Sequence, residues 1–357
     1  MKEALPVAVI GAGHMGRHHV RKYAEMDSAN LIAVVDANLE RARELAEPLG
    51  VKYASELTAD LGDVAAVSVA VPTVHHLRIA KPLIERGVAV LVEKPLAPTL
   101  ADAEEIAALA RRHNTIVQVG HTERFNPAVR AIDRLGVRPK FVETHRISPF
   151  TFRSADVGVV FDMMIHDIDI LLHLVQEDIE QVDAVGVNVL SKHEDIANAR
   201  VRFGAGAVAN LTASRLALKT ERKLRVFCEH AYVSLDYQKK VGIAITLDKN
   251  LDVLELAREH NVEDLSQLAG LDFGQMVTVE PLTIHDKDAL QDELETFLDC
   301  VRNRKPPPVS ADAGVAAIRL ATMIVDSIKS HRWDGDASGR IGLEADIVRS
   351  QAADAKR

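Results

Sequence analysis

The chain has 357 residues and a formal net charge of −9; 47% of its residues are apolar, 27% are charged and 4% are aromatic. This length and composition indicate a two-domain globular protein, whereas the negative charge and the few aromatic residues argue against nucleic acid as a partner. The sequence contains no apolar run of about 20 residues that could cross a membrane, no leader-like N-terminus and no CxxC pair. We therefore expect a cytoplasmic protein without a membrane span, a disulfide framework or a Cys-ligated metal.

Strand-like and helix-like segments alternate over the first 122 residues. Five apolar runs are spaced along this region: Val7–Ile10, Leu31–Val35, Val64–Val71, Val88–Val92 and Thr115–Val119. Helical patterns such as Leu39–Leu49 and Leu100–Arg112 lie between them. Continuous apolar strands separated by helices are typical of a parallel sheet that is covered on both faces. The sequence therefore predicts an α/β fold with a doubly wound Rossmann domain over residues 1–122.

From residue 123 onward, strands follow one another. The strand-like segments are Lys140–Ile147, Val182–Leu190, Ala197–Phe203, Ala207–Ser214, Leu224–Glu229 and Tyr232–Tyr237. Two helical patterns come after them, Lys287–Arg304 and Ala311–Ser330, with three prolines between them that cannot continue a helix. We expect an α+β domain over residues 123–335 with a large, mostly antiparallel open sheet, and a polar tail over residues 336–357. An open sheet face favours a partner subunit, so we expect a homodimer or a homotetramer.

A glycine-rich turn follows the first predicted strand and opens the first helix: Gly11-Ala12-Gly13-His14-Met15-Gly16. In a dinucleotide fold the three glycines permit the tight turn, the approach of the pyrophosphate and close helix–strand packing, and the helix N-terminus faces the phosphates. Asp36 ends the second predicted strand, where a carboxylate would accept hydrogen bonds from the adenosine ribose and repel a 2′-phosphate. We therefore predict NAD as the cofactor. The alternatives are NADP, which Arg41 and Arg43 in the next helix could favour, a surface turn without a ligand, and Asp36 as a helix N-cap.

Three further motifs stand at the ends of later predicted strands, where open α/β sheets bind their ligands. They contribute Pro72, Thr73 and His76 after the third strand, Glu93 and Lys94 after the fourth, and His121 after the fifth. The proline that follows Lys94 disfavours a helical backbone there, so we expect Lys94 to be extended at the sheet edge with its amine toward the cleft. The alternative is a solvated lysine in an ordinary loop.

A polar stripe lies on an otherwise apolar helical segment of the second domain. Asp162, His166 and Asp169 are spaced at i, i+4 and i+7, so a helix brings them to one face. The residues between them are almost all apolar, which indicates a site wall rather than a solvated face. The alternatives are Asp162 as an N-cap with His166 as a core histidine, and a metal site that uses several histidines. No spacing matches a common zinc motif, so we expect no metal.

Lys94, His166 and Asp162 form a set sufficient for alcohol oxidation. His166 can accept the hydroxyl proton because histidine titrates near neutral pH. The Lys94 ammonium would stabilise the negative charge that develops on the oxygen, and Asp162 would orient the base. The hydride would pass to the nicotinamide.

These motifs resemble those of the glucose–fructose oxidoreductase, inositol dehydrogenase and MocA (Gfo/Idh/MocA) family. The matching pieces are GAGHMG, PTVHH, EKPLA, the strand-end Gly120-His121, and DMMIHDID in place of the family's common D-x-G-x-H-x-x-D. The resemblance implies that Lys94 contacts the nicotinamide ribose and the substrate hydroxyl, that His166 is the catalytic base and that Asp162 is the acid beside it. The family's glycine is Met164 here, which predicts less room near the substrate.

Two stretches, His121–Pro127 and Ser148–Ser154, resemble the bacterial branch of UDP-N-acetylglucosamine 3-dehydrogenases. That resemblance implies oxidation of a nucleotide sugar to a 3-keto sugar, which is then aminated on the way to the diamino sugars of lipid A. Guanidinium groups suit a diphosphate. The predicted substrate site consists of Lys94, Arg124, Asn126, Arg146, Arg153, Asp162 and His166. The runner-up is a dehydrogenase of a free sugar or inositol, and a third hypothesis is a nicotinamide-sensing regulator, which should lack the catalytic lysine or histidine.

Overall fold

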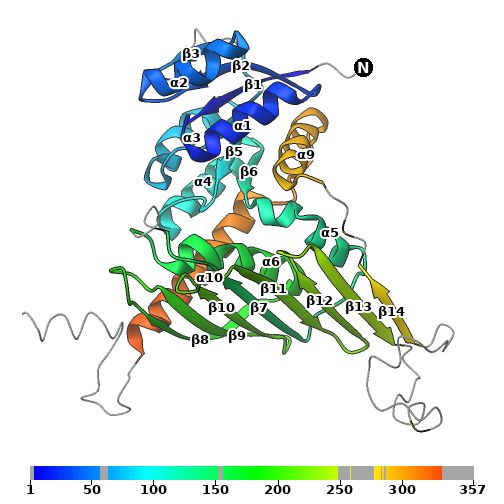
Figure 1. Cartoon of the computed structure of the whole chain (residues 1–357). Helices are drawn as coiled ribbons and strands as arrows, with labels where there is room; N and C mark the ends of the chain where they lie inside the picture. The colour runs from blue at the N-terminus through cyan, green and yellow to red at the C-terminus, as the bar shows by residue number, and fades with distance from the viewer. Residues whose placement is uncertain are drawn as a thin grey trace, which may run out of the picture. The chain divides into compact units, whose positions relative to one another are not determined.

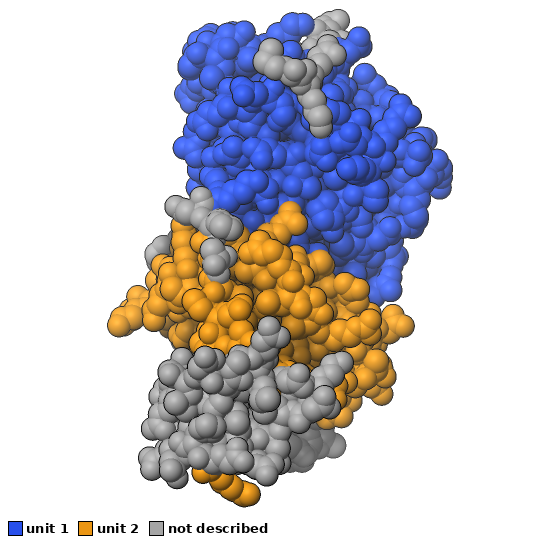
Figure 2. Space-filling view, turned by 90° about the vertical axis from the view of Figure 1, so that its right-hand side faces the viewer, with its two compact units in different colours: residues 1–126, 287–322 blue, residues 127–286, 323–357 orange. Residues whose placement is uncertain are grey.

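The chain folds into two compact units, which Figure 2 shows in different colours. The computed structural model describes residues 4–56, 63–151, 156–247, 258, 277–282, 284 and 287–331. Unit 1 comprises Met1–Asn126 and Lys287–Thr322, and unit 2 comprises Pro127–Asp286 and Met323–Arg357. The segment 287–322 thus belongs to unit 1, whereas a division at residue 122 puts it in the second domain. None of the described helices is long and apolar enough to cross a membrane.

Unit 1 is built on a six-stranded parallel sheet in the order β3-β2-β1-β4-β5-β6 (Figure 1). The strands are β1 (Leu5–Ile10), β2 (Ala29–Val35), β3 (Lys52–Ala54), β4 (Ala66–Val69), β5 (Ala89–Glu93) and β6 (Val117–Gly120). The helices are α1 (His14–Glu25), α2 (Leu39–Ala46), α3 (His76–Glu85), α4 (Leu100–His113) and α9 (Ala289–Asn303). Every residue of β4, β5 and β6 is buried, as expected for a sheet covered on both faces. The predicted doubly wound fold is confirmed.

The strand order reverses between β1 and β4. The chain runs from β1 through β2 to β3 on one side of the sheet, and β4, β5 and β6 follow on the other side. The connections that leave the carboxyl ends of β1 and β4 therefore diverge. This is the position where open α/β sheets bind their ligands.

Helix α9 joins unit 1 from the far end of the chain. Lys22 on α1 pairs with Asp288, the N-cap residue of α9, at 2.8 Å. Three apolar side chains of α9 are fully buried in a core cluster shared with α1, β1 and β2: Leu294, Phe297 and Leu298. Burial of this apolar surface explains why the segment belongs to the first unit.

Unit 2 is built on an eight-stranded sheet in the order β14-β13-β12-β11-β7-β10-β9-β8 (Figure 1). The strands are β7 (Phe141–Ile147), β8 (Ile179–Val187), β9 (Ile196–Phe203), β10 (Val208–Ser214), β11 (Glu221–Phe227), β12 (Ala231–Asp236), β13 (Val241–Leu247) and β14 (Val277–Pro281). The helices are α5 (Pro127–Asp133), α6 (Ile165–Val175) and α10 (Ala311–Ser330), which begins in unit 1 and ends in unit 2. β7 and β10 are parallel and all other neighbours are antiparallel. The predicted mostly antiparallel sheet is confirmed.

Buried and exposed residues alternate along the strands of this sheet, so the sheet has one covered face and one outer face. On β9, Ala197, Ala199, Val201 and Phe203 are buried, whereas the polar residues between them are exposed. This period of two is typical of a sheet packed on one side only. Helix α6 lies along the covered face, and no described helix or strand lies over the outer face (Figure 1).

A buried carboxylate holds the loops at one end of this sheet together. Asp195 accepts hydrogen bonds from the N–H groups of Val189, Leu190 and Ser191 at 2.7, 2.6 and 3.1 Å. Arg215, which follows β10, donates to its other oxygen at 2.8 Å. Burial raises the pKa of Asp195, but the hydrogen bonds from Leu190, Val189 and Arg215 outweigh it and lower the pKa to about 2.

We expect Asp195→Asn to lower the melting temperature at pH 7 by about 5–10 °C, because it removes one partner of a buried pair. A carboxyl group whose pKa falls on folding contributes fully above its unfolded pKa of 3.8, and that contribution is lost as the pH falls toward 2. Circular-dichroism melts should therefore show a difference in melting temperature between wild type and variant that becomes smaller below about pH 4. Glu229→Gln, at an exposed carboxylate, is the control. A difference in melting temperature that stays constant with pH would contradict the lowered pKa of Asp195.

Candidate active site

The glycine turn of unit 1 has the geometry of a phosphate cradle. Gly11 has a φ of +103°, which residues with side chains rarely adopt. A Cβ at Gly11 would overlap the carbonyl oxygen of Ala70, and a Cβ at Gly16 would overlap that of Gly11. At Gly13, by contrast, a Cβ would meet no described atom within 4 Å. The turn is therefore tightly packed on its inner side and open where a ligand must approach.

The N-terminus of α1 opens at this turn. Its N-cap is Gly13, no capping side chain bonds to it, and the first turn, which includes His14 and Met15, contains no acidic residue. The first N–H groups of a helix carry partial positive charge and have no partner within the helix. This end of α1 therefore suits a pyrophosphate.

Asp36 follows β2 and faces the glycine turn. One carboxylate oxygen accepts the N–H of Ala12 at 2.7 Å, and the other accepts the N–H of Asn38 at 2.8 Å. The N-cap of α2 is Asn38, whose side chain accepts from Arg41, so the N-cap reading of Asp36 is wrong. Each carboxylate oxygen keeps a further lone pair, which leaves Asp36 able to accept from ribose hydroxyls.

The remaining unit 1 residues follow neighbouring strands of one sheet edge. The final residues of β1 and β4, Ile10 and Val69, pair with each other, as do those of β5 and β6, Glu93 and Gly120, and Val69 pairs with Val92 next to the end of β5. Beyond these ends lie Pro72 and Thr73 before α3, Lys94 after β5, and His121 after β6. Lys94 is half-buried, its bond to Pro95 is cis, and His121 is 1% exposed. Apart from His76, the predicted cofactor residues named here thus follow the carboxyl edge of the sheet.

His76 is turned into the protein instead of toward this edge. Its ring is fully buried; Nδ1 lies 3.1 Å and 3.2 Å from the carbonyl oxygens of Pro95 and Leu96, and Nε2 lies 3.0 Å from that of Val71. Burial lowers the pKa of His76, while the carbonyl contacts oppose that change. His76 therefore lies between the loop after β4 and the loop that carries Lys94, and a neutral imidazole there donates to a carbonyl from one ring nitrogen only.

In unit 2, the predicted helix with Asp162 and His166 is present, but its first turn is not α-helical. Val160–Met164 form a π-helical turn, in which the N–H of Ile165 reaches back to the carbonyl of Val160, and α6 continues from there. A π-turn accommodates an extra residue and is frequent at functional sites. Asp162 and His166 are half-buried within the helix that lies on the covered face of the sheet.

A buried glutamate supports the start of this helix. The Glu194 side chain accepts the N–H of Val160 at 3.1 Å, and its backbone carbonyl accepts the N–H of Val159 at 3.0 Å. A Cβ at Gly158 would overlap the Glu194 carboxyl group. The loop before β9 thus satisfies helix N–H groups that have no partner within the helix.

A buried ion pair fixes α6 to the sheet beside the candidate base. Arg146 on β7 donates from Nε and Nη2 to the two oxygens of Asp167 at 2.9 and 2.8 Å, and both side chains are 4% exposed. Bidentate pairs of this kind are strongly directional. Asp167 directly follows His166, so its ion pair with Arg146 holds the helix turn that carries this candidate base. The prediction that Arg146 meets a diphosphate finds no support in this arrangement.

The other predicted substrate residues differ in their burial and in their contacts. Arg124 is 6% exposed and lies in the short helix Thr122–Phe125 of unit 1. Asn126 follows it and donates to Glu123 at 3.1 Å. Arg153 lies outside the described residues. Met164 is fully buried, so it presents no surface to a substrate, and the expected narrowing of the pocket is not supported.

Sequence reasoning missed the buried residues that support these groups. They are His19, which lies 2.9 Å from Glu93, together with Glu194 and Asp167. His19 and Glu93 are 74 residues apart, and no local pattern links such positions. For Asp167 the available signal was a charged residue within an otherwise largely apolar helix, which indicates a buried partner.

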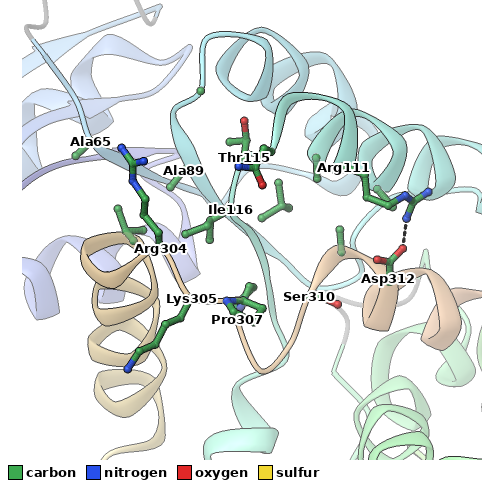
Figure 3. Close-up of a pocket in the computed structure, with 18 residues that line it drawn as sticks. Ala65, Ala89, Arg111, Thr115, Ile116, Arg304, Lys305, Pro307, Ser310 and Asp312 are labelled. Carbon is green, nitrogen blue, oxygen red and sulfur yellow. Dashed lines mark hydrogen bonds and ion pairs between the residues drawn. The ribbon is translucent and has the colours of Figure 1, made fainter.

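A cavity of about 590 Å³ in unit 1 lies at the other edge of the parallel sheet (Figure 3). Ala65, Ala89 and Val117 line it, and these residues stand at the amino-terminal ends of β4, β5 and β6. Arg111 and Asp312, which pair with each other, lie at its rim. Because the glycine turn and Lys94 follow the carboxyl ends of the strands, this cavity is separate from the candidate active site.

Both units match known protein families. A model of an oxidoreductase family with an NAD-binding Rossmann fold matches residues 5–121, and a model of the GFO/IDH/MocA C-terminal domain matches residues 137–234. The chain belongs to the Gfo/Idh/MocA family. The resemblance suggested by the motifs at the strand ends is thereby confirmed.

Two relatives of this Gfo/Idh/MocA chain bear on its chemistry. UDP-N-acetylglucosamine 3-dehydrogenase from Acidithiobacillus ferrooxidans is 32% identical over 317 residues, which cover 88% of this chain and 95% of that protein. A solved structure of that enzyme has a TM-score of 0.79 at 30% identity and covers 91% of this chain and 97% of that chain. Myo-inositol 2-dehydrogenase from Thermotoga maritima is 26% identical over 347 residues, which cover 91% of this chain and 97% of that protein.

This member of the family is an NAD-dependent dehydrogenase. The residues of unit 1 fit the cofactor: Gly13 leaves open space, the α1 N-terminus offers N–H donors, and Asp36 offers carboxylate oxygens. These are the three features that a dinucleotide requires of a Rossmann turn.

We expect Asp36→Asn to weaken NADH binding about 10-fold, because it removes a charged acceptor from the ribose site. The same change should narrow the preference for NADH over NADPH, since the repulsion of a 2′-phosphate is lost. Fluorescence titrations with both reduced cofactors give the two Kd values. Glu40→Gln, at an exposed carboxylate in the first turn of α2, should leave both unchanged. Equal binding of NADH by the Asp36 variant and the wild type would refute the ribose role.

Proposed function

We propose that the protein oxidises a ring hydroxyl of a sugar, namely C3 of UDP-N-acetylglucosamine, to the 3-keto sugar. The observation that carries this proposal is the presence of a lysine, Lys94, at the carboxyl edge of the unit 1 sheet and of Asp162 and His166 on the helix that covers the unit 2 sheet. A cation, a base and a carboxylate suffice to remove a hydroxyl proton while the carbinol hydride leaves. The similarity to the Acidithiobacillus enzyme supports the choice of sugar.

In the proposed reaction, each side chain acts on the carbinol oxygen. Bound NAD supplies a nicotinamide ring that accepts the hydride from the carbinol carbon. The Lys94 ammonium donates a hydrogen bond to the oxygen and stabilises negative charge as the O–H bond breaks. His166 accepts the hydroxyl proton, since an imidazole can take up a proton near neutral pH. The C–H and O–H bonds break, and the C=O bond of the ketone forms.

Asp162 has a supporting role in this proposal. It lies four residues before His166, across the π-helical turn. A carboxylate next to an imidazole favours the orientation and charge that the base needs once it has taken up the proton. The ketone product carries an electrophilic carbonyl at C3, which suits a subsequent transamination.

Oxidation of UDP-N-acetylglucosamine can be measured from NADH formation at 340 nm, with an aminotransferase specific for the 3-keto sugar added to draw the equilibrium forward. We expect His166→Ala to lower kcat by about 100-fold or more while NADH binding stays unchanged. Lys94→Ala should lower kcat to a similar extent. The matched control is His173→Ala, at a histidine of the same helix that pairs with Asp133. Full turnover by His166→Ala would refute the assignment of the base.

A second candidate is oxidation of a free cyclitol or sugar. The similarity to the Thermotoga myo-inositol enzyme favours it, as does the engagement of Arg146 with Asp167 instead of an open pocket. The same assay with myo-inositol and free N-acetylglucosamine decides between the two candidates. Turnover of these compounds without turnover of the UDP-sugar would replace the first proposal with the second.

We also propose that the outer face of the unit 2 sheet joins copies of the chain into a homodimer or homotetramer. Phe227 stacks there between Phe141 and Tyr232, with ring centroids 5.5 and 4.9 Å apart. Arg225 pairs with Glu143 on the same face at 3.0 Å. A face that mixes aromatic groups with arginine pairs has the composition of protein interfaces.

Light scattering should therefore give a mass of two or four times 39.0 kDa for the wild type. Phe227→Lys should shift the mass toward the monomer, because it puts a charge into the aromatic cluster. Leu218→Lys changes an apolar residue that is 98% exposed in a loop outside the sheet, and it should leave the mass unchanged. A wild-type mass of one chain would exclude this interface.

A further inference from the structure

A chain of buried contacts connects α1 to the backbone of Lys94. His19 lies on α1, three residues after Gly16, and its ring is fully buried. Its Nε2 is 2.9 Å from Oε1 of Glu93, the last residue of β5. The other oxygen of Glu93 accepts the backbone N–H of Lys94 at 3.3 Å. One carboxyl group therefore stands between the helix of the glycine turn and the lysine.

The Glu93 side chain is confined in this position. It is 7% exposed, and a Cβ built at Gly120 on the neighbouring strand would lie only 3.1 Å from its Cα, Cδ and Oε2 atoms. Glu93 therefore fills the space that a side chain at position 120 would need, and the glycine there permits this close packing. The contact with His19 occupies the other oxygen, so the carboxyl group is held at both ends.

Stability alone gives a poor reason for histidine at position 19. The Nδ1 atom is buried, and no described residue is its hydrogen-bond partner. A buried polar atom without a partner is unfavourable, and an apolar side chain of similar size would remove that cost if Glu93 were also replaced. The Nε2–H tautomer satisfies the contact, since it donates to the carboxylate and leaves only a lone pair unpaired.

We propose that His19 is a positioning residue for Lys94. It orients the Glu93 carboxyl group, and that group fixes the Lys94 backbone relative to the helix that binds the cofactor phosphates. The role of Lys94 itself rests on the proposed function. A displacement of a reacting group by about 1 Å can cost about 100-fold in rate, so a link of this kind acts on kcat more than on cofactor binding.

Four proteins test the proposal: wild type, His19→Leu, His19→Gln and the control Tyr23→Phe. Leucine fills space without donating a hydrogen bond, and glutamine can still donate from its amide. Tyr23 lies one turn further along α1, and its buried hydroxyl bonds to Ser68 at 2.9 Å. Tyr23→Phe thus removes a buried hydrogen bond of the same helix that does not involve Glu93.

Two measurements are needed. The first is kcat on whichever substrate the wild type oxidises, together with the Kd for NADH. We expect His19→Leu to lower kcat about 10- to 100-fold with little change in the Kd for NADH. His19→Gln should keep a kcat closer to that of the wild type, and Tyr23→Phe should keep the wild-type kcat. The second is hydrogen exchange of the Lys94 amide in the protein without substrate, which should be faster in His19→Leu than in either the wild type or Tyr23→Phe.

The outcomes separate the two proposals. Equal kcat losses in His19→Leu and Tyr23→Phe, or unchanged exchange at Lys94 in His19→Leu, would overturn the positioning role and leave it as helix packing. If the wild type oxidises none of the sugars tested, the proposed function fails, while faster exchange at Lys94 would still establish that His19 holds this part of the backbone.

Discussion

The close approach of Gly11 to Ala70 is the contact on which the cofactor edge depends. At this point the chain leaving β1 passes the chain leaving β4, and no side chain fits between them. Gly16 repeats the constraint in the first turn of α1, where it lies against the carbonyl of Gly11. Because α1 is thereby seated directly on the sheet, its N-terminus opens at the carboxyl edge. Asp36, Thr73 and Lys94 reach the same edge only because their strands are parallel and end near it.

In both units, a buried ionisable neighbour holds the residue assigned to chemistry. Glu93 precedes Lys94 and is tied to His19, and Asp167 follows His166 and is tied to Arg146. In each pair, the inward side chain fixes the backbone while the side chain next to it stays half-buried. Buried polar pairs add little net stability compared with apolar packing. Their directionality explains their presence here better than their energy does, since hydride transfer requires groups that are held in place.

Local sequence patterns predicted the parts of this structure whose geometry is set by residues close together in the chain. Strand and helix periodicity predicted the parallel sheet, and the spacing of Gly11, Gly13 and Gly16 predicted the turn, because both follow from backbone geometry. The placement of α9 in unit 1 was not predictable, since it depends on apolar contacts with a cluster more than 200 residues earlier in the chain. The engagement of Arg146 was missed for the same reason: its partner Asp167 is fixed by tertiary packing, and an arginine near a cleft suits a diphosphate equally well.

A bulky residue, Met164, ends the π-helical turn before α6 at the position where the family commonly has glycine. The sequence alone suggested an α-helical face with Met164 crowding the substrate. In the structure the turn from Val160 to Met164 holds an extra residue, and the methionine is fully buried while Asp162 and His166 stay half-buried. Glu194 supplies the acceptor that the first N–H groups of this turn require. Because Met164 presents no surface to a ligand, it does not set the substrate preference, and the determinants of that preference must be sought among side chains that do present one.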